Sequence, residues 1–141
     1  MANKKVLVIP CSGIGKAFGS VGREATYLVV EDLRPTQTDT LCLSRLTMGD
    51  QEARRLVAEC ATITIDGCPK ACAQVNVEAS GGKPVANLRV VDIYRQNRAL
   101  KVDSVLELGE NGRQLARILA DKVADEVDRI LAESEERDNH A

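Results

Sequence analysis

The sequence has very few aromatic residues: it contains no tryptophan, and aromatic side chains make up 2% of its 141 residues. Proteins that bind single-stranded nucleic acids stack the bases on aromatic side chains, so this shortage argues against that kind of binding. The formal net charge of -2 also argues against a surface that neutralises a phosphate backbone. We therefore expect no nucleic-acid partner.

Long hydrophobic runs are also missing. A membrane-spanning helix needs about 20 consecutive apolar residues, and no stretch of this sequence approaches that length. The apolar run at residues 6–9 follows two lysines, but it is much too short for the core of a signal peptide. We therefore expect a cytoplasmic protein with no membrane partner.

Histidine occurs once, at His140, close to the C-terminus, where chains are commonly disordered, so we do not expect it to bind a metal. The sequence does contain five cysteines. In a cytoplasmic protein these favour metal or redox chemistry over a disulfide framework. A hydrophobic content of 44% and a charged content of 28% are typical of a soluble globular protein, and the length suits a single domain over residues 1–141.

Predicted strands and helices alternate along the chain. Apolar or β-branched runs predict strands at residues 5–10, 41–43, 61–65 and 85–94. Helical spacing of apolar residues, with Ser20, Asp50 and Asn111 as N-caps, predicts helices at about 20–34, 50–60, 68–80 and from 111 onward. The acidic residues 133–138 are expected to be a solvated end. This pattern predicts an α/β fold: a small doubly wound, mostly parallel sheet with helices on both faces and strand order 2-1-3-4.

Two cysteines follow the third predicted strand in the stretch Asp66-Gly67-Cys68-Pro69-Lys70-Ala71-Cys72. Proline suits the first position of a helix, so we predict a helix that begins at Cys68. Cys68 and Cys72 would then share one helix face, with Cβ atoms about 5–6 Å apart. A helix N-terminus favours the thiolate, which is the form that binds metals. We expect Asp66 to fix the turn by accepting backbone hydrogen bonds; the alternative is a base near the cysteines.

The other cysteines are placed by the same topology. Cys11 follows the first predicted strand and Cys42 lies at or after the second, so both should meet Cys68 and Cys72 at the carboxyl edge of the sheet. Neighbouring strands are about 4.8 Å apart and zinc–sulfur bonds are about 2.3 Å long, so loops beyond the strands can close the remaining gap. Cys60 precedes the third strand, at the opposite edge, and we expect it to be a core residue.

Several motifs resemble the DGC-domain family of zinc-binding proteins, which is named for the Asp-Gly-Cys seen at residues 66–68. The matching stretches are Pro10-Cys11-Ser12-Gly13, Gly19-Ser20-Val21-Gly22-Arg23-Glu24-Ala25, Cys42-Leu43 and Ile65-Asp66-Gly67-Cys68-Pro69-Lys70-Ala71-Cys72-Ala73. They occur in order over roughly the first half of the chain. The resemblance implies that four cysteines, Cys11, Cys42, Cys68 and Cys72, bind zinc. It implies no particular reaction.

Other interpretations of the same residues fit less well. The spacing of Cys68 and Cys72 is not the Cys-x-x-Cys of thioredoxin-like proteins. Ala17 stands where a small phosphatase that used Cys11 as its nucleophile would need an arginine. The glycines at 13, 15 and 19 are expected to let the chain fold tightly around Cys11 rather than to bind phosphate.

The sequence leaves the function open between two classes. The first is a zinc-binding protein in which the four-cysteine site has a structural or regulatory role. The second is a thiol-dependent enzyme or sulfur carrier, with Cys11 as the preferred nucleophile, and an iron–sulfur protein is a third interpretation, ranked below zinc. Lys16, Arg23 and Lys70 are either charge partners of the site or solvated side chains, and Arg23 could face an anionic ligand. No protein or small-molecule partner is identified.

Overall fold

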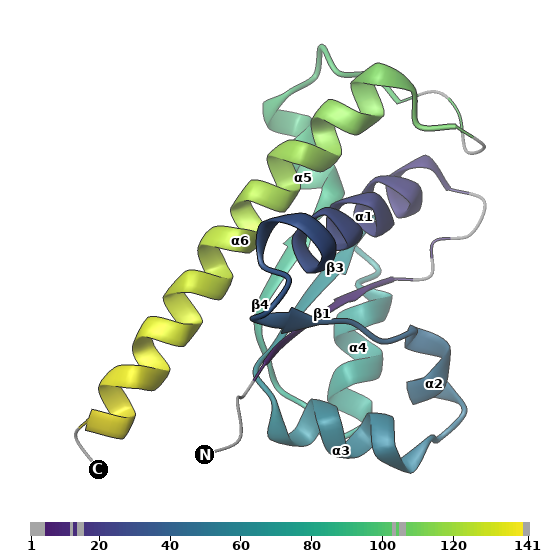
Figure 1. The fold of residues 1–141 in the computed structure, drawn as a ribbon. Coiled ribbons are helices and arrows are strands. Elements are labelled where there is room, and N and C mark those ends of the chain that lie inside the picture. Colours follow the sequence, from purple (N-terminus) through teal and green to yellow (C-terminus); the bar gives the residue numbers. More distant parts are fainter. Residues whose placement is uncertain (1–4, 12, 14–15, 103, 105–106, 140–141) are drawn as a thin grey trace.

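The computed structural model describes residues 5–139 except for positions 12, 14–15, 103 and 105–106. Its described residues form a parallel sheet in the order β2-β1-β3-β4, as predicted (Figure 1). The strands are β1 (Val6–Pro10), β2 (Thr38–Asp39), β3 (Thr62–Asp66) and β4 (Pro84–Arg89). From β1 the chain continues to β2 on one side of β1, and then crosses to β3 on its other side. The topological switch point therefore lies between the ends of β1 and β3.

Helices cover both faces of the sheet, which confirms the α/β fold (Figure 1). They are α1 (Ala17–Tyr27), the π-helical segment η1 (Leu28–Leu33), α2 (Leu43–Thr47), α3 (Gln51–Glu59), α4 (Cys72–Ala79), α5 (Val90–Gln96) and α6 (Gly109–Asn139). Helices α1, α5 and α6 lie on one face, and α2, α3 and α4 lie on the other.

Alternating side chains of the strands divide the core into two clusters, as the period of a strand requires. Val8 of β1 and Ile63 of β3 pack against α1 and α6. Ile9 of β1 points to the other face and packs with Val57 of α3 and Val77 of α4. On that second face, β3 contributes the buried polar residues Thr62, Thr64 and Asp66. The sheet is therefore apolar on one face and partly polar on the other, close to the carboxyl edge.

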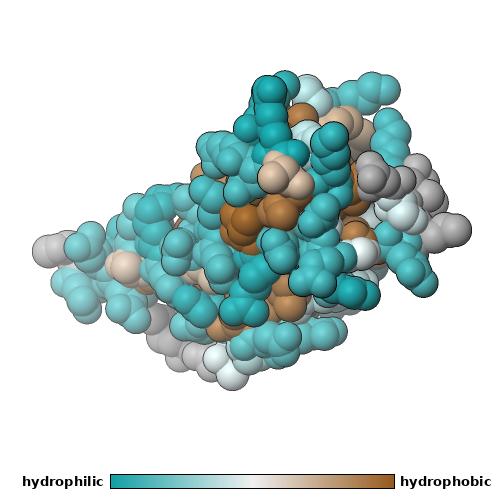
Figure 2. Space-filling view, turned by 90° about the horizontal axis from the view of Figure 1, so that it is seen from above, coloured by the Kyte–Doolittle hydropathy of each residue, from teal (hydrophilic) through white to brown (hydrophobic). Residues whose placement is uncertain are grey.

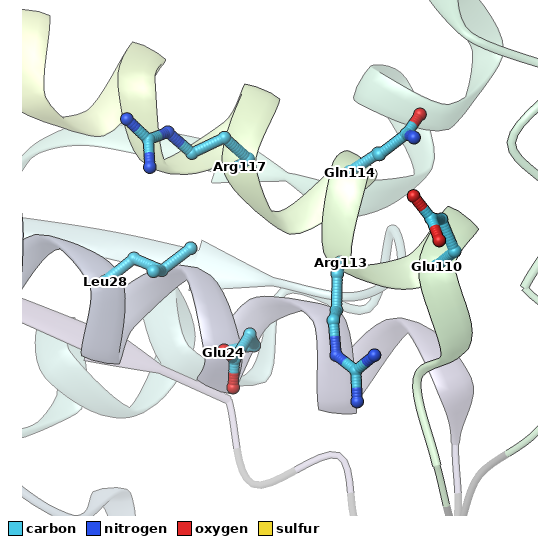
Figure 3. A pocket seen from close by; sticks show the side chains of 6 residues that line it. All are labelled: Glu24, Leu28, Glu110, Arg113, Gln114 and Arg117. Atoms are coloured by element: carbon cyan, nitrogen blue, oxygen red, sulfur yellow. The ribbon is translucent and has the colours of Figure 1, made fainter.

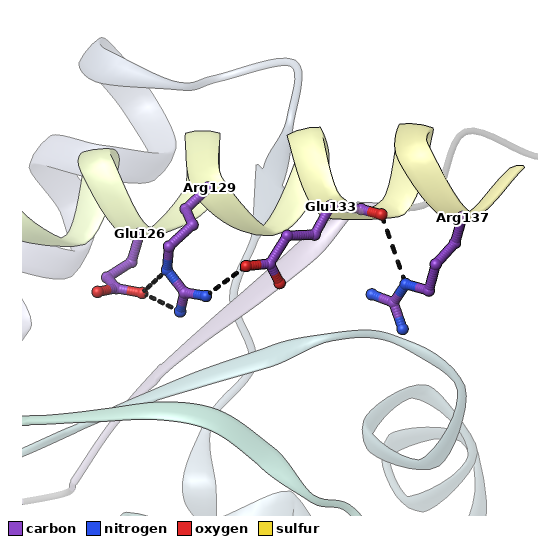
Figure 4. A network of polar contacts seen from close by, with 4 residues as sticks. All are labelled: Glu126, Arg129, Glu133 and Arg137. Atoms are coloured by element: carbon purple, nitrogen blue, oxygen red, sulfur yellow. Dashed lines mark hydrogen bonds and ion pairs between the residues drawn. The ribbon is translucent and has the colours of Figure 1, made fainter. Parts of the chain in front are cut away.

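Helix α6 is longer than the core that it covers. Its apolar stripe is buried from Leu115 to Ile130, as the sequence spacing predicts. Beyond Ile130 the chain stays helical, with Arg129 bonded to Glu126 and Glu133 and with Arg137 donating to the carbonyl of Glu133 (Figure 4). The acidic residues 133–138 are largely solvated, as expected, but they form the last turns of a helix supported by pairs spaced three and four residues apart.

Two predicted strands are wrong in extent. The second strand is Thr38–Asp39 instead of residues 41–43, and Leu43 begins α2. The fourth strand ends at Arg89, and Val90 begins α5. Residues 90–94 are rich in β-branched and aromatic side chains, which favour strands, but Val90 and Ile93 are buried with helical spacing.

Three predicted helix starts are also wrong, one of them that of α4, which begins at Cys72 instead of Cys68. Helix α1 begins at Ala17 instead of after Ser20, and α6 begins at Gly109 instead of Asn111. The prediction for Asp50 is confirmed, since its carboxylate accepts a hydrogen bond from the N–H of Glu52 at the start of α3. Strong side-chain caps are therefore visible in the sequence, whereas helix starts without a side-chain cap are not.

Viewed from above, the surface is mostly hydrophilic around a small hydrophobic patch (Figure 2). Within the part of the chain that the structure describes, no helix combines the length and apolarity that crossing a membrane requires.

Candidate functional site at the carboxyl edge of the sheet

Cys11 lies directly after β1 at the switch point of the sheet. Its backbone N–H donates to the carbonyl of Ile65, which continues the pairing of β1 with β3 by one residue. Its side chain is buried, with 9% of the residue exposed, and its Sγ accepts a hydrogen bond from the N–H of Gly67 at 3.3 Å. The Asp66-Gly67-Cys68 segment is thereby held against Cys11.

Glycines allow the chain to close around this sulfur. Gly13 has a φ of +48°, and a Cβ added there would lie 2.5 Å from Cα of Gly19. A Cβ on Gly19 would in turn lie 2.4 Å from the carbonyl oxygen of Gly13. Gly67 contacts the same region, with its hypothetical Cβ 3.3 Å from the nitrogen of Gly19. The predicted packing role of Gly13 and Gly19 is confirmed, whereas positions 14 and 15 lie outside the described residues.

Cys68 and Cys72 are arranged differently from the prediction. Helix α4 begins at Cys72, and residues 68–71 form a turn in which the N–H of Ala71 donates to the carbonyl of Cys68. Ala71 is left-handed, with a φ of 53°, so it separates Cys68 from the helix. The prediction of one shared helix face is therefore wrong. Cys68 is half-buried in the turn, and Cys72 is exposed at the start of α4.

Asp66 caps α4 from the end of β3. Its carboxylate accepts hydrogen bonds from the N–H groups of Ala73 at 2.7 Å and Gln74 at 3.2 Å, and from the side-chain amide of Asn87 at 2.9 Å. Asn87 also donates to Thr64 and accepts from Arg89. The expected role in backbone hydrogen bonding is confirmed, but its targets are in the first turn of α4 rather than in the turn at 67–71. Asn87 and Arg89 were not found from the sequence, because no local motif marks them.

Cys42 lies between β2 and α2 and is exposed. Its Sγ is 3.0 Å from the hydroxyl oxygen of Ser44. This hydrogen bond, together with the nearby backbone N–H groups of Ser44 and Arg45, lowers the pKa of the Cys42 thiol. Cys42 is therefore the thiol of this edge that both contacts solvent and favours the thiolate form.

Cys11 has the opposite environment. Burial raises the pKa of its thiol, and this outweighs the hydrogen bond from Gly67, which lowers it. Negative charge on Asp66, Cys72 and Cys68 raises the pKa further. The sulfur of Cys11 is thus electrostatically coupled to both cysteines of the 68–72 segment. A cation near these groups would remove that repulsion and favour the Cys11 thiolate.

A cavity of about 390 Å³ connects Cys11 with Cys42. Its lining includes Arg23, Thr26 and Tyr27 of α1 and residues between Thr40 and Arg45. The volume is within the usual range of small-molecule sites. The cavity opens at the same sheet edge as the predicted metal ligands, which is where open α/β sheets place their sites.

The four predicted ligands all follow strand ends at this edge, but the structure does not assemble them into a metal centre. Among the residues that the structure describes, no group of three or more His, Cys, Asp or Glu side chains could hold a metal ion. The donor set is chemically suited to zinc, because thiolates are its usual structural ligands. The four cysteines therefore suit zinc by their residue type and by their position at one edge of the sheet. For all four sulfurs to bind one zinc ion, Cys42 and the 68–72 segment would have to approach Cys11.

Cys60 lies at the other edge, as predicted. It follows the last turn of α3 and packs against the apolar cluster on that face of the sheet. It also lines a cavity at the amino edge together with Lys5 and Arg137. Cys60 is therefore remote from the site in topology and serves as a natural control for experiments on the other cysteines.

A larger groove between α1 and α6 differs from the site in its chemistry (Figure 3). Its lining combines Glu24 of α1 and Glu110 of α6 with Arg113 and Arg117. Arg117 is already paired with Asp121. The acidic and basic side chains of this groove balance in charge, so the groove does not favour either an anionic or a cationic ligand.

The fold and this edge define a class: a parallel α/β protein with cysteines on the loops after three adjacent strands. Residues 7–110 match the DGC domain, so the chain belongs to the DGC domain family. The match covers the sheet except for Val6, the four predicted ligands and α1 to α5, and it ends at the beginning of α6. Comparisons with curated proteins and with solved structures found no match.

Proposed function

We propose that this protein binds zinc through Cys11, Cys42, Cys68 and Cys72, and that the site has a structural or regulatory role. The observation that carries the proposal is the hydrogen bond from Gly67 to the sulfur of Cys11, which holds the Asp-Gly-Cys segment against the end of β1. Zinc would supply a cross-link between the loops after β1, β2 and β3. A site closed by four thiolates leaves no open position for substrate, which is why we do not assign a reaction to it.

Support for the fourth ligand comes from the cavity. Cys42 and Cys11 line the same cavity, so the segment between β2 and α2 has space on the side that faces Cys11. Cys72 is also exposed, and the turn at 68–71 is not part of a helix. The ligands that must move are therefore on loops or at a helix end, whereas Cys11 is fixed by the sheet.

Metal analysis of the purified full-length protein tests this proposal. We expect one zinc ion per chain, and loss of zinc in each of the serine variants of Cys11, Cys42, Cys68 and Cys72. Cys60→Ser is the matched control and should keep its zinc, because Cys60 lies at the opposite edge. Full zinc in Cys42→Ser with none in Cys60→Ser would contradict the assignment. A brown protein with iron and labile sulfide would replace zinc by an iron–sulfur cluster.

The second candidate function is thiol chemistry, and the structure favours Cys42 over Cys11 for it. Cys42 is exposed and lines a cavity of about 390 Å³, whereas Cys11 is buried. A nucleophile must reach its substrate, so the earlier preference for Cys11 is replaced. Full zinc in Cys42→Ser, with loss in the other three variants, would support this function, because Cys42 would then be free to react beside a three-cysteine site.

A further inference from the structure

The cavity between α1 and α2 has an unusual charge for this protein. Its described lining contains Arg23 and Arg45 but no Asp or Glu, although acidic residues outnumber basic ones in the chain by 21 to 19. Four other cavities among the described residues each have at least one carboxylate in their walls. The basic groups of this lining are therefore Arg23 and Arg45, and its acidic groups are the thiols of Cys11 and Cys42 rather than carboxylates.

The two arginines come from different helices. Arg23 projects from α1, where its Nη2 donates to the hydroxyl of Ser20 at 3.1 Å. Arg45 belongs to α2; its Nε lies 2.7 Å and its Nη2 2.6 Å from the carboxylate of Asp50, and Nη2 also lies 3.6 Å from Glu52. Among the described residues no partner contacts Nη1 of Arg45, so one end of this guanidinium can still donate to a ligand.

The rest of the lining suits an organic body attached to the anionic group. Pro10, Leu41 and Leu43 supply apolar surface, and Tyr27 lies on the rim with 51% of its surface exposed. Ligand sites commonly combine apolar walls with a few polar groups that fix orientation. A free inorganic ion would use only the arginines and leave most of the volume empty.

We propose that this cavity binds a small organic anion, with its carboxylate or oxyanion group held by Arg23 and Arg45 and its body against Pro10, Leu41 and Leu43. The proposal rests on the proposed function in one respect, because the ligand would lie beside Cys11 and Cys42 and would thus reach the thiol site. It gives Arg23 the anion-facing role that the sequence left open.

Benzoate and its uncharged analogue benzyl alcohol test the proposal on the full-length protein. Backbone amide shifts are followed by NMR during titration with each probe. With benzoate we expect saturable shifts at Thr40–Leu43 and in α1. Benzyl alcohol should bind more weakly, by about tenfold or more, because it lacks one charge-assisted hydrogen bond. Equal binding of the two probes, no saturable binding of benzoate, or shifts centred on the groove between α1 and α6 would overturn it.

Arginine variants assign the contact. Arg23→Gln should weaken benzoate binding by about tenfold, whereas Arg55→Gln, an exposed control on α3, should leave it unchanged. Arg45→Gln should also weaken binding, but Arg45 holds Asp50, so the assignment depends on Arg23→Gln. Unchanged benzoate affinity in Arg23→Gln would overturn the proposal. The titrations use the metal-free protein, because a zinc site that draws Cys42 to Cys11 would occupy this cavity. Absence of benzoate binding removes this inference alone, and benzoate binding by a protein that takes up no added zinc removes only the proposed function.

Discussion

Asn87 of the edge strand β4 donates a hydrogen bond at 2.9 Å to the buried carboxylate of Asp66 at the end of β3. The same carboxylate receives the backbone N–H groups of Ala73 and Gln74 in the first turn of α4. Asp66 is 1% exposed, so its carboxylate has no access to bulk water as a replacement for these donors. The hydrogen bonds of Asp66 with Asn87, Ala73 and Gln74 therefore position the start of α4 and Cys72. Asn87 belongs to β4, which is two strands away from the β1 strand that precedes Cys11.

Removal of this carboxylate should be costly. In Asp66→Ala the amides of Ala73 and Gln74 and the side chain of Asn87 lose their acceptor, and we expect the free energy of unfolding to fall by about 3 kcal/mol. Urea denaturation followed by circular dichroism measures this loss. Asp125→Ala, at an exposed position on α6, is the matched control and should change stability by less than about 0.5 kcal/mol. Similar losses in the two variants would contradict the capping role.

The strand order and the shared edge of the cysteines could be predicted, because they follow from the alternation of strands and helices and from the rules for parallel sheets. They depend little on the exact ends of each element. The position of Cys68 could not. Pro69 is compatible with both a first helical turn and a loop, and the left-handed conformation of Ala71 is not favoured by its residue type. The capping hydrogen bond from the N–H of Ala73 to the carboxylate of Asp66 joins residues that are seven positions apart. Such a contact depends on the path of the chain after β3, which local sequence does not specify.

Helix α5 is a second element that local sequence does not specify. Val90, Val91, Ile93 and Tyr94 have high β-propensity, yet they form a helix that packs its Val90 and Ile93 on the sheet. Phe18 of α1 contacts the ring of Tyr94, with ring centroids 5.4 Å apart. Tertiary packing therefore overrides local preference at this point. The residues that complete the cavity, such as Tyr27 and Arg45, could not be predicted either, because only the folded chain brings residues of α1 and α2 to one cavity.

Gly19→Ala should destabilise the protein and disturb Cys11. An added Cβ would lie 2.4 Å from the carbonyl oxygen of Gly13, which is backbone and cannot rotate away. We expect a loss of at least about 2 kcal/mol, since overpacking that forces backbone shifts costs roughly 1–3 kcal/mol. Gly81→Ala is the matched control: it has open space but a φ of +94°, so it should cost only about 1–2 kcal/mol. The distinguishing measurement is thiol access, because only Gly19→Ala should expose Cys11 to alkylation.

The pair formed by Arg34 and Asp128 joins the end of η1 to α6. Arg34 donates from Nε and Nη2 to the two carboxylate oxygens, each at 2.8 Å. These contacts lower the pKa of Asp128. A carboxyl group whose pKa is lower in the folded state adds stability above its unfolded pKa of about 3.9, and this contribution is lost as the pH falls through the folded value.

A double-mutant cycle of Arg34→Gln and Asp128→Asn measures this contribution. We expect a coupling of about 0.5–1 kcal/mol at neutral pH, because the pair is bidentate but partly solvated. The coupling should fall towards zero below about pH 4 and should weaken in high salt. The pair of Arg95 and Asp92 within α5 is more exposed and serves as the comparison. A coupling at Arg34 and Asp128 that grows as the pH falls would contradict the assigned direction.

Thiol reactivity should rank the cysteines of the metal-free protein. Cys42 is exposed and its pKa is lowered, so it should be alkylated first by iodoacetamide at neutral pH. Cys11 should be last, because it is buried and its pKa is raised. Mass spectrometry of peptides from a time course gives each rate separately. We expect Cys42 to react clearly faster than Cys11, because the lowered pKa raises its thiolate fraction and the sulfur of Cys11 is covered.

The same time course with added zinc connects reactivity to the proposed site. Protection of Cys42 together with Cys11, Cys68 and Cys72 is expected if all four are ligands, whereas Cys60 should react at an unchanged rate. A Cys42 that remains fast while the other three become protected would assign it to thiol chemistry instead. Alkylation of Cys11 before Cys42 in the metal-free protein would show that the hydrogen bond from Gly67 does not keep that sulfur enclosed. The order of modification thus tests the packing around Cys11 directly, independently of whether zinc binds.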